Sequence, residues 1–159
     1  MYHDPGFYTV RMSSFADASA RASVRRRIEA LTPNAQRRWG RMTPHQMLCH
    51  LADGYRMSAG TRNPGAVDNF ISRSLIRWVA LHTSLVWPKG AKTVPEGDQE
   101  QGGTRPIEWD RDHAELLGMI DNFQPVEGHK HPMFGPLTAA EWSVWAFRHA
   151  DHHLRQFGL

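Results

Sequence analysis

Two histidines one helical turn apart near the end of the chain, His149 and His153, constrain the fold more than any other feature of the sequence. They follow Thr138 and Glu141, a T-x-x-E spacing in which each side chain bonds a backbone N–H at the start of a helix. The sequence therefore predicts a helix that begins at about Ala139 and carries both histidines.

Both histidines fall in the middle of the apolar stripe of this helix, together with Trp142 and Trp145. An imidazole in an apolar seam needs a partner for each ring nitrogen. Side chains at i and i+4 project side by side, so a divalent metal fits between them. One such pair is a weak signal, because many buried histidines are simply hydrogen-bonded. A third histidine nitrogen from another helix would favour a metal site over hydrogen-bonded core histidines.

A second helix is predicted from Thr43, Pro44 and Gln46, which combine a capping box with proline at the first helical position. On this helix His50 points the same way as two methionines, whereas His45 lies on another face. Taken by itself, His50 is more typical of a core histidine bonded to a carbonyl than of a metal ligand. It is nevertheless the candidate for the third nitrogen.

Three further elements are predicted from apolar periodicity. Ser14 followed by Asp17 starts the first helix, which Thr32 and Pro33 close. A third helix is predicted from about Val67 to Trp87, and a fourth from about Glu108 to Phe123. The third is apolar over most of its circumference, so we expect it to be well covered. The segment from Pro88 to Pro106 is rich in Lys, Gly, Gln, Glu and Pro, so we expect a mobile loop without elements of its own that borders the site.

Length and composition bound the class of protein. A chain of 159 residues suits a single domain, here residues 1–159. Cys49 is the only cysteine and no apolar run opens the sequence, which predicts a cytoplasmic protein. No stretch reaches the roughly 20 apolar residues of a membrane span. A net charge of +3 without a nucleic-acid motif predicts no nucleic-acid partner.

The leader Phe7–Met12 is predicted to be a short edge strand.

Several other side chains are secondary ligand candidates. His113 falls on the apolar stripe of the fourth helix, and His152 lies at the edge of the stripe of the last. His129 and His131 have an H-x-H spacing, although on a loop such residues are more often exposed or capping. Asp53, one turn after His50, is a candidate fourth ligand or a carboxylate that orients a ligand.

These motifs carry a resemblance to a known family. The segments Met42–Pro44, Met47–His50, His131–Thr138 and His149–Gly158 resemble the DinB/YfiT-like superfamily of metalloenzymes, and in particular an uncharacterised branch of it. The resemblance covers nearly the whole chain. Its most specific part is the closing run D-H-H-L-R-Q-F-G, which begins at Asp151.

The resemblance implies an all-α fold, an antiparallel four-helix bundle, here with an additional helix and a long loop. It also implies a divalent ion, zinc or nickel, held by the positions that match His50, His149 and His153. Several members of the family are transferases or isomerases that use a low-molecular-weight thiol. Homodimers are common among them.

The residues and the resemblance converge on one hypothesis for function. Three histidines leave coordination positions open, which is typical of a catalytic rather than a structural metal. We therefore expect a metal-dependent enzyme acting on a small molecule, either a thiol-dependent transferase or a hydrolase. The alternative is a non-catalytic metal- or ligand-binding helical bundle.

The expected homodimer suggests an interface. Val144, Phe147 and Leu154 lie on the face of the last helix opposite the histidines, where a bundle helix with one core face should be polar. Either the third helix covers these side chains or a second copy of the chain does. The family resemblance favours the second copy, with this helix packed against its counterpart.

Overall fold

The computed structural model describes residues 12–63, 65–90 and 93–159, and within them the chain forms five α-helices and one small two-stranded sheet. The all-α class predicted from the sequence is confirmed. The proposed leader strand Phe7–Met12 lies outside the described residues except for its last residue.

The two capping boxes start helices where the sequence predicts. In α2, Pro44–Ser58, the Thr43 side chain accepts a hydrogen bond from the backbone N–H of Gln46. In α5, Ala139–Gln156, Thr138 and Glu141 form the second complete box. These two helices carry the three principal histidines, so local sequence alone determines where each ligand candidate sits along its helix.

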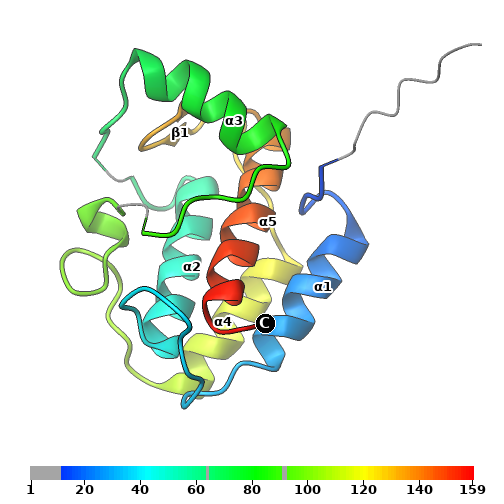
Figure 1. Cartoon of the computed structure of the whole chain (residues 1–159), viewed down its shortest axis with the longest axis vertical. Helices are drawn as coiled ribbons and strands as arrows, with labels where there is room; N and C mark the ends of the chain where they lie inside the picture. Colours follow the sequence, from blue (N-terminus) through cyan, green and yellow to red (C-terminus); the bar gives the residue numbers. More distant parts are fainter. Residues whose placement is uncertain (1–11, 64, 91–92) are drawn as a thin grey trace, which may run out of the picture.

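Two further helices enclose the core together with α2 and α5. Both α1, Ala18–Glu29, and α2 contact α4, Trp109–Asp121, and α5 (Figure 1). Fully buried side chains from all four helices fill the space between them; these include Ile28, Leu51, Leu116, Ile120, Trp142 and Leu154.

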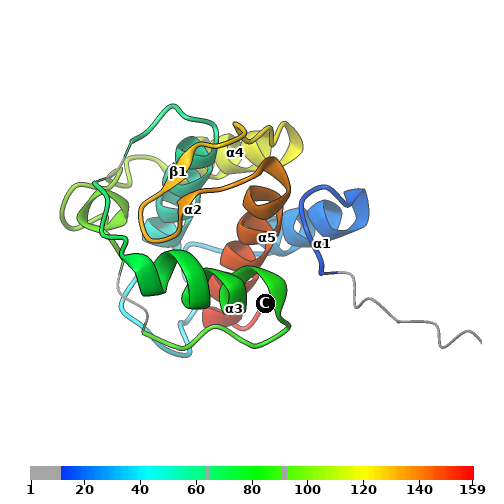
Figure 2. The same ribbon diagram turned by 90° about the horizontal axis from the view of Figure 1, so that it is seen from above.

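The predicted third helix is shorter and far more exposed than expected. Residues 70–82 are helical, with a π-helical turn over Ser72–Ile76 followed by α3, Arg77–His82. Phe70 is 85% exposed and Trp78 is 58% exposed, so the expectation that this helix is well covered is wrong. Figure 2 shows it lying across one side of the molecule, where it contacts α5. It is held there by the buried side chains of Ala80 and Leu81 and by Arg77, which donates two hydrogen bonds to Glu141.

The segment after this helix also differs from the prediction. It contains a 3-10 turn, Pro95–Gly97, and buries Gly97, Asp98 and Gln99. Polar contacts rather than apolar burial hold it: Arg62 donates hydrogen bonds to the carbonyls of Glu96 and Gly102. Composition counts apolar surface only, and for that reason it missed an element held by hydrogen bonds.

A short hairpin precedes α5. Strands β1, Lys130–His131, and β2, Gly135–Pro136, pair antiparallel and place His131 in the interior. Across the described residues, no helix combines the length and apolar character that crossing a membrane requires.

The outer face of α5 is only partly covered within the monomer. Leu154 is fully buried, and α1 packs along this helix with Arg27 bonded to Asp151 at 2.8 Å. Val144 and Phe147 are half-buried. The predicted contact between copies is therefore wrong for Leu154 and stays a prediction for Val144 and Phe147.

Candidate metal centre

Three histidines from two helices form a nearly symmetric triangle. The ring centroids of His50, His149 and His153 lie 4.7–4.8 Å apart, with interplanar angles of 72–79°. One nitrogen from each ring lies within 4.8 Å of the other two, and all three residues are buried. The structure thus brings together the three residues that the sequence singled out.

Hydrogen bonds assign the proton of His50. Its Nδ1 lies 2.7 Å from the carbonyl oxygen of Gly97. A carbonyl can only accept, so Nδ1 donates, and the neutral ring then has a free lone pair on Nε2. That nitrogen faces the other two histidines, because it lies 2.9 Å from Nε2 of His149.

The proton of His153 is assigned through Gln156. The side-chain amide of Gln156 donates from Nε2 to the carbonyl of Trp39 at 2.8 Å, which orients its Oε1 toward Nδ1 of His153 at 3.1 Å. Nδ1 of His153 therefore donates, and Nε2 is again the unprotonated nitrogen. Such outer hydrogen bonds are what orient metal-binding imidazoles.

His149 cannot satisfy both of its nitrogens with protein partners. Its Nδ1 is buried and has no hydrogen-bond partner in the described part of the chain. Nε2 of His149 lies 2.9 Å from the unprotonated Nε2 of His50. It either donates a hydrogen bond to that atom or faces it with a lone pair of its own. A cation bound by both facing nitrogens would remove the repulsion between the two lone pairs.

A close approach between helices makes room for His149. Gly54 on α2 faces α5, and a Cβ built on it would lie 2.7 Å from the Trp145 ring and 3.3 Å from Nδ1 of His149. The space beside Gly54 is filled by these two rings, whose centroids lie 4.4 Å apart with an interplanar angle of 31°. A larger residue at this position would displace the Trp145 ring and crowd His149.

Burial keeps the triad uncharged. It lowers the pKa of His50 and lowers the pKa values of His149 and His153 well below the ordinary value, with repulsion among the rings adding to the effect for the latter two. Neutral imidazole is the form that binds divalent metals. Three buried imidazoles, two of them with lone pairs oriented by hydrogen bonds, fit zinc or nickel better than calcium or magnesium, which prefer oxygen.

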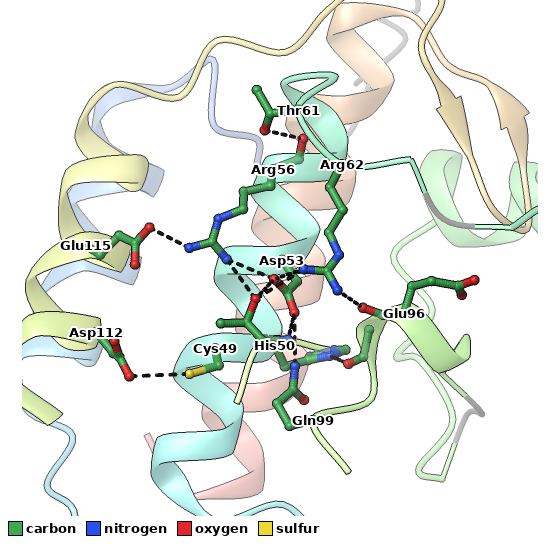
Figure 3. Close-up of polar contacts among 12 residues, drawn as sticks. Cys49, His50, Asp53, Arg56, Thr61, Arg62, Glu96, Gln99, Asp112 and Glu115 are labelled. Atoms are coloured by element: carbon green, nitrogen blue, oxygen red, sulfur yellow. Dashed lines mark hydrogen bonds and ion pairs between the residues drawn. The ribbon is translucent and has the colours of Figure 1, made fainter. Parts of the chain in front are cut away.

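Asp53 does not act as a ligand. Its carboxylate is completely buried and lies between the guanidinium groups of Arg56 and Arg62 at 2.8 and 2.9 Å (Figure 3). It also accepts hydrogen bonds from the backbone N–H and hydroxyl of Thr104. Asp53 therefore fixes the segment that ends near Thr104, and this segment includes the Gly97 carbonyl that orients His50.

The structure also assembles a second set of ligand-type side chains, which sequence reasoning missed. His45, Cys49 and Asp112 place one ligand atom each within 4.8 Å of one another. Asp112 accepts hydrogen bonds from His45 at 2.8 Å, from the backbone of Ile107, from Arg111 and from the Cys49 thiol. Burial, together with the Asp112 charge, raises the pKa of Cys49 to about 12, so the thiol keeps its proton. The i, i+4 spacing of His45 and Cys49 was the available signal.

The remaining candidates stand apart from the triad's ligand set. His113 lies 2.9 Å from the carbonyl of Ile28, on the α1 side of the molecule. His131 accepts hydrogen bonds from the backbone of Met133 and Phe134, and burial lowers its pKa to about 3. Among the described residues, neither His129 nor His131 belongs to a group of three or more ligand-type side chains close enough to hold an ion. His152 is half-buried next to His153, with ring centroids 5.1 Å apart.

Two clefts meet at the triad. One, of about 430 Å³, has His50, His149 and His153 in its wall. The other, of about 480 Å³, shares Thr93, Gly97, His152 and His153 with the first and is lined by charged residues that include Arg41, Asp98 and Glu100. The predicted position of the loop beside the site is thus confirmed for Thr93 and Gly97.

Comparison with protein-family models, characterised proteins and solved structures finds no match. The interpretation of the site therefore depends on its own geometry.

Proposed function

We propose that His50, His149 and His153 bind one divalent ion, zinc or nickel, through their Nε2 atoms, and that the protein is a metal-dependent enzyme acting on a small molecule. The observation that carries this proposal is the orientation of the rings. The Nδ1 atoms of His50 and His153 are committed to Gly97 and Gln156, which leaves their unprotonated Nε2 atoms for a shared cation.

Access to the triad supports catalysis over a structural role. A structural zinc site is closed by four protein ligands, whereas this one has three histidines beside an open cleft. A bound ion supplies Lewis acidity there, lowering the pKa of a bound water or thiol or polarising a carbonyl. We therefore propose a thiol-dependent transferase or a hydrolase.

Protein groups around the triad have distinct roles in this proposal. Gly97 and Gln156 orient two ligands, and the Trp145 ring covers one side of His149 and excludes water there. His152 lines both clefts and lies beside His153, so its imidazole is placed to form a hydrogen bond with a bound molecule.

The DinB/YfiT-like resemblance points to the same three histidines, and we extend the proposal to membership of that superfamily and to its four-helix bundle type. The mutual contacts of α1 and α2 with α4 and α5 support this bundle. A cytoplasmic location and a homodimer belong to the same proposal. Sedimentation of the purified protein tests the dimer, and a monomer at all concentrations would contradict it.

Metal analysis and turnover test the function in two steps. The purified protein should contain about one zinc or nickel ion per chain, as three oriented nitrogens imply. The double variant His149→Ala with His153→Ala should lose it, while His129→Ala, from the unassembled H-x-H pair, retains it. Metal content that survives in the double variant contradicts the site.

Turnover then separates the enzyme from the non-catalytic alternative. Chelator-treated protein should be inactive toward a panel of thiol acceptors and simple esters, and added metal should restore activity. A protein that binds metal stoichiometrically yet never turns over any of these compounds would be the non-catalytic metal-binding bundle instead.

A further inference from the structure

The cleft of about 430 Å³ beside the triad has an unusual lining. Its walls come from α2, α5, the exposed 70–82 helix and the segments around residues 85–97 and 131–134. Its apolar side chains include Val79, Leu85, Trp87 and Trp145.

No Asp, Glu, Lys or Arg lines this cleft within the part of the chain that the structure describes. Its polar members are histidines and Thr93. His131 and the triad histidines are buried, and His152 is half-buried. The described lining therefore has no carboxylate, ammonium or guanidinium group, whereas the neighbouring cleft carries both signs.

Hydrogen bonds within the wall keep it apolar. The indole N–H of Trp87 donates to the carbonyl of Ala80 at 3.2 Å, which leaves the carbon atoms of the ring to face a ligand. Arg148 donates to the carbonyls of Thr83 and Leu85, and its guanidinium lies 5.5 Å from the Trp87 ring centroid. The nearby cation is thus engaged in holding the wall and is absent from the described lining.

We propose that this cleft binds an uncharged molecule with an aryl or alkyl body and a single polar group, which is placed at the histidines. An apolar body gains free energy by leaving water, while a charge in this lining would lose its hydration and find no counter-ion. The volume lies in the range of small-molecule sites. The inference that the polar group lies at the histidines rests on the proposed function, whereas the inference that the apolar body binds does not.

Binding of N-phenyl-1-naphthylamine, an uncharged probe whose emission rises in apolar surroundings, tests this inference in chelator-treated and zinc-supplemented full-length protein. Saturable binding at one site per chain is expected in both. In the chelator-treated protein, methyl 1-naphthoate should displace the probe, and 1-naphthoate, which has the same aromatic body with a charge, should compete about 10-fold more weakly or not at all. The two competitors are compared without metal, because a carboxylate is itself a zinc ligand.

Two leucines of equal exposure provide the matched variants. Leu85 and Leu75 are both 61% exposed, but only Leu85 lines the cleft. Leu85→Glu should weaken probe binding by about 10-fold, because it adds a carboxylate to the rim, and Leu75→Glu should leave it unchanged. Val79→Trp should block binding by filling the space. Circular dichroism and metal content report whether each variant keeps its fold and its metal site.

Three results would overturn the inference. These are absence of saturable binding to the wild type, equal competition by the ester and the carboxylate, and a loss in Leu75→Glu that equals or exceeds that in Leu85→Glu. The last would place the probe on the exposed helix. Failure of the metal proposal has a different signature, since a protein that never binds metal would still bind the probe.

Discussion

The two faces of α2 carry two groups of ligand-type side chains that differ in how they are satisfied. On the α4 face, His45 and Cys49 meet Asp112, which accepts hydrogen bonds from four groups. On the α5 face, His50 meets two histidines and no carboxylate. Both groups are close enough for an ion, so proximity does not distinguish them.

The difference lies in what each inward-facing atom already binds. Asp112 is a counter-ion and acceptor for its neighbours, and the Cys49 thiol keeps its proton, so this group is complete without a metal. In the triad, protein acceptors take the outer nitrogens of His50 and His153, while the outer nitrogen of His149 has no partner in the described part of the chain, and the inner nitrogens of His50 and His149 face each other. Unsatisfied, mutually oriented lone pairs are therefore the better indicator of a metal site.

The largest expected effect is a difference in zinc affinity between alanine substitutions at two adjacent residues of α2. His50→Ala should weaken zinc binding by roughly 100-fold or more, since the free energy of a metal site is divided among few ligands. Cys49→Ala, one residue earlier, should leave the affinity unchanged. Titration with a competing chelator measures both. A larger loss in Cys49→Ala than in His50→Ala would place the metal on the α4 face instead.

A smaller effect is expected from the outer hydrogen bond of His153. Gln156→Met keeps the length of the side chain but removes the acceptor for Nδ1 and the donor to Trp39. Metal affinity should fall by about 10- to 100-fold without loss of the fold. Gln36→Met, at an exposed glutamine, is the control. An unchanged affinity in Gln156→Met would show that the orientation of His153 does not depend on this bond.

The α4 face should respond in stability rather than in metal binding. Asp112→Asn should destabilise the fold by about 1–3 kcal/mol at pH 7, because it removes the charge that Arg111 and His45 face. Asp110→Asn, exposed two residues earlier, should change stability by less than about 0.5 kcal/mol. Urea unfolding measures both, and an undiminished metal content is expected in each.

The difference in stability between wild type and Asp112→Asn should depend on pH with a defined sign. Burial opposes the Asp112 charge, but hydrogen bonds from Ile107, Arg111 and His45 outweigh it and hold the pKa of this carboxyl below its ordinary value. The stabilisation is therefore complete above the unfolded pKa of about 3.9 and is lost as the pH falls below it. The gap between wild type and Asp112→Asn should shrink below about pH 4. A gap that grows there would contradict the assignment.

The smallest effect concerns the other buried atom without a partner. In the described structure the Tyr55 hydroxyl has no hydrogen bond, and its ring packs against Phe15 and Phe123. Tyr55→Phe should raise stability by about 1 kcal/mol or less and leave metal binding unchanged, because the hydroxyl serves no ligand. A strong destabilisation would show that this hydroxyl has a partner. The missing partner of Nδ1 of His149 would then be weaker support for a metal site.

The elements predicted best are those encoded within a few residues. The capping boxes of Thr43 and Thr138 place the starts of α2 and α5, and helical periodicity places His50, His149 and His153 on inward faces. Such signals are local, since a cap acts over one turn and a stripe repeats along one helix. The sequence by itself therefore determined the all-α class and the three residues that face one another.

Tertiary structure decided what surrounds them, because the partners are distant in the chain. The acceptor for His50 is Gly97, 47 residues away, and Asp53 binds Thr104, 51 residues away. No composition rule shows that a polar segment will be buried by such contacts, or that α1 rather than a second copy covers Leu154. Likewise, the apolar helix at 70–82 is exposed because helical periodicity reports which side chains are apolar but not which surfaces the fold leaves available to cover them.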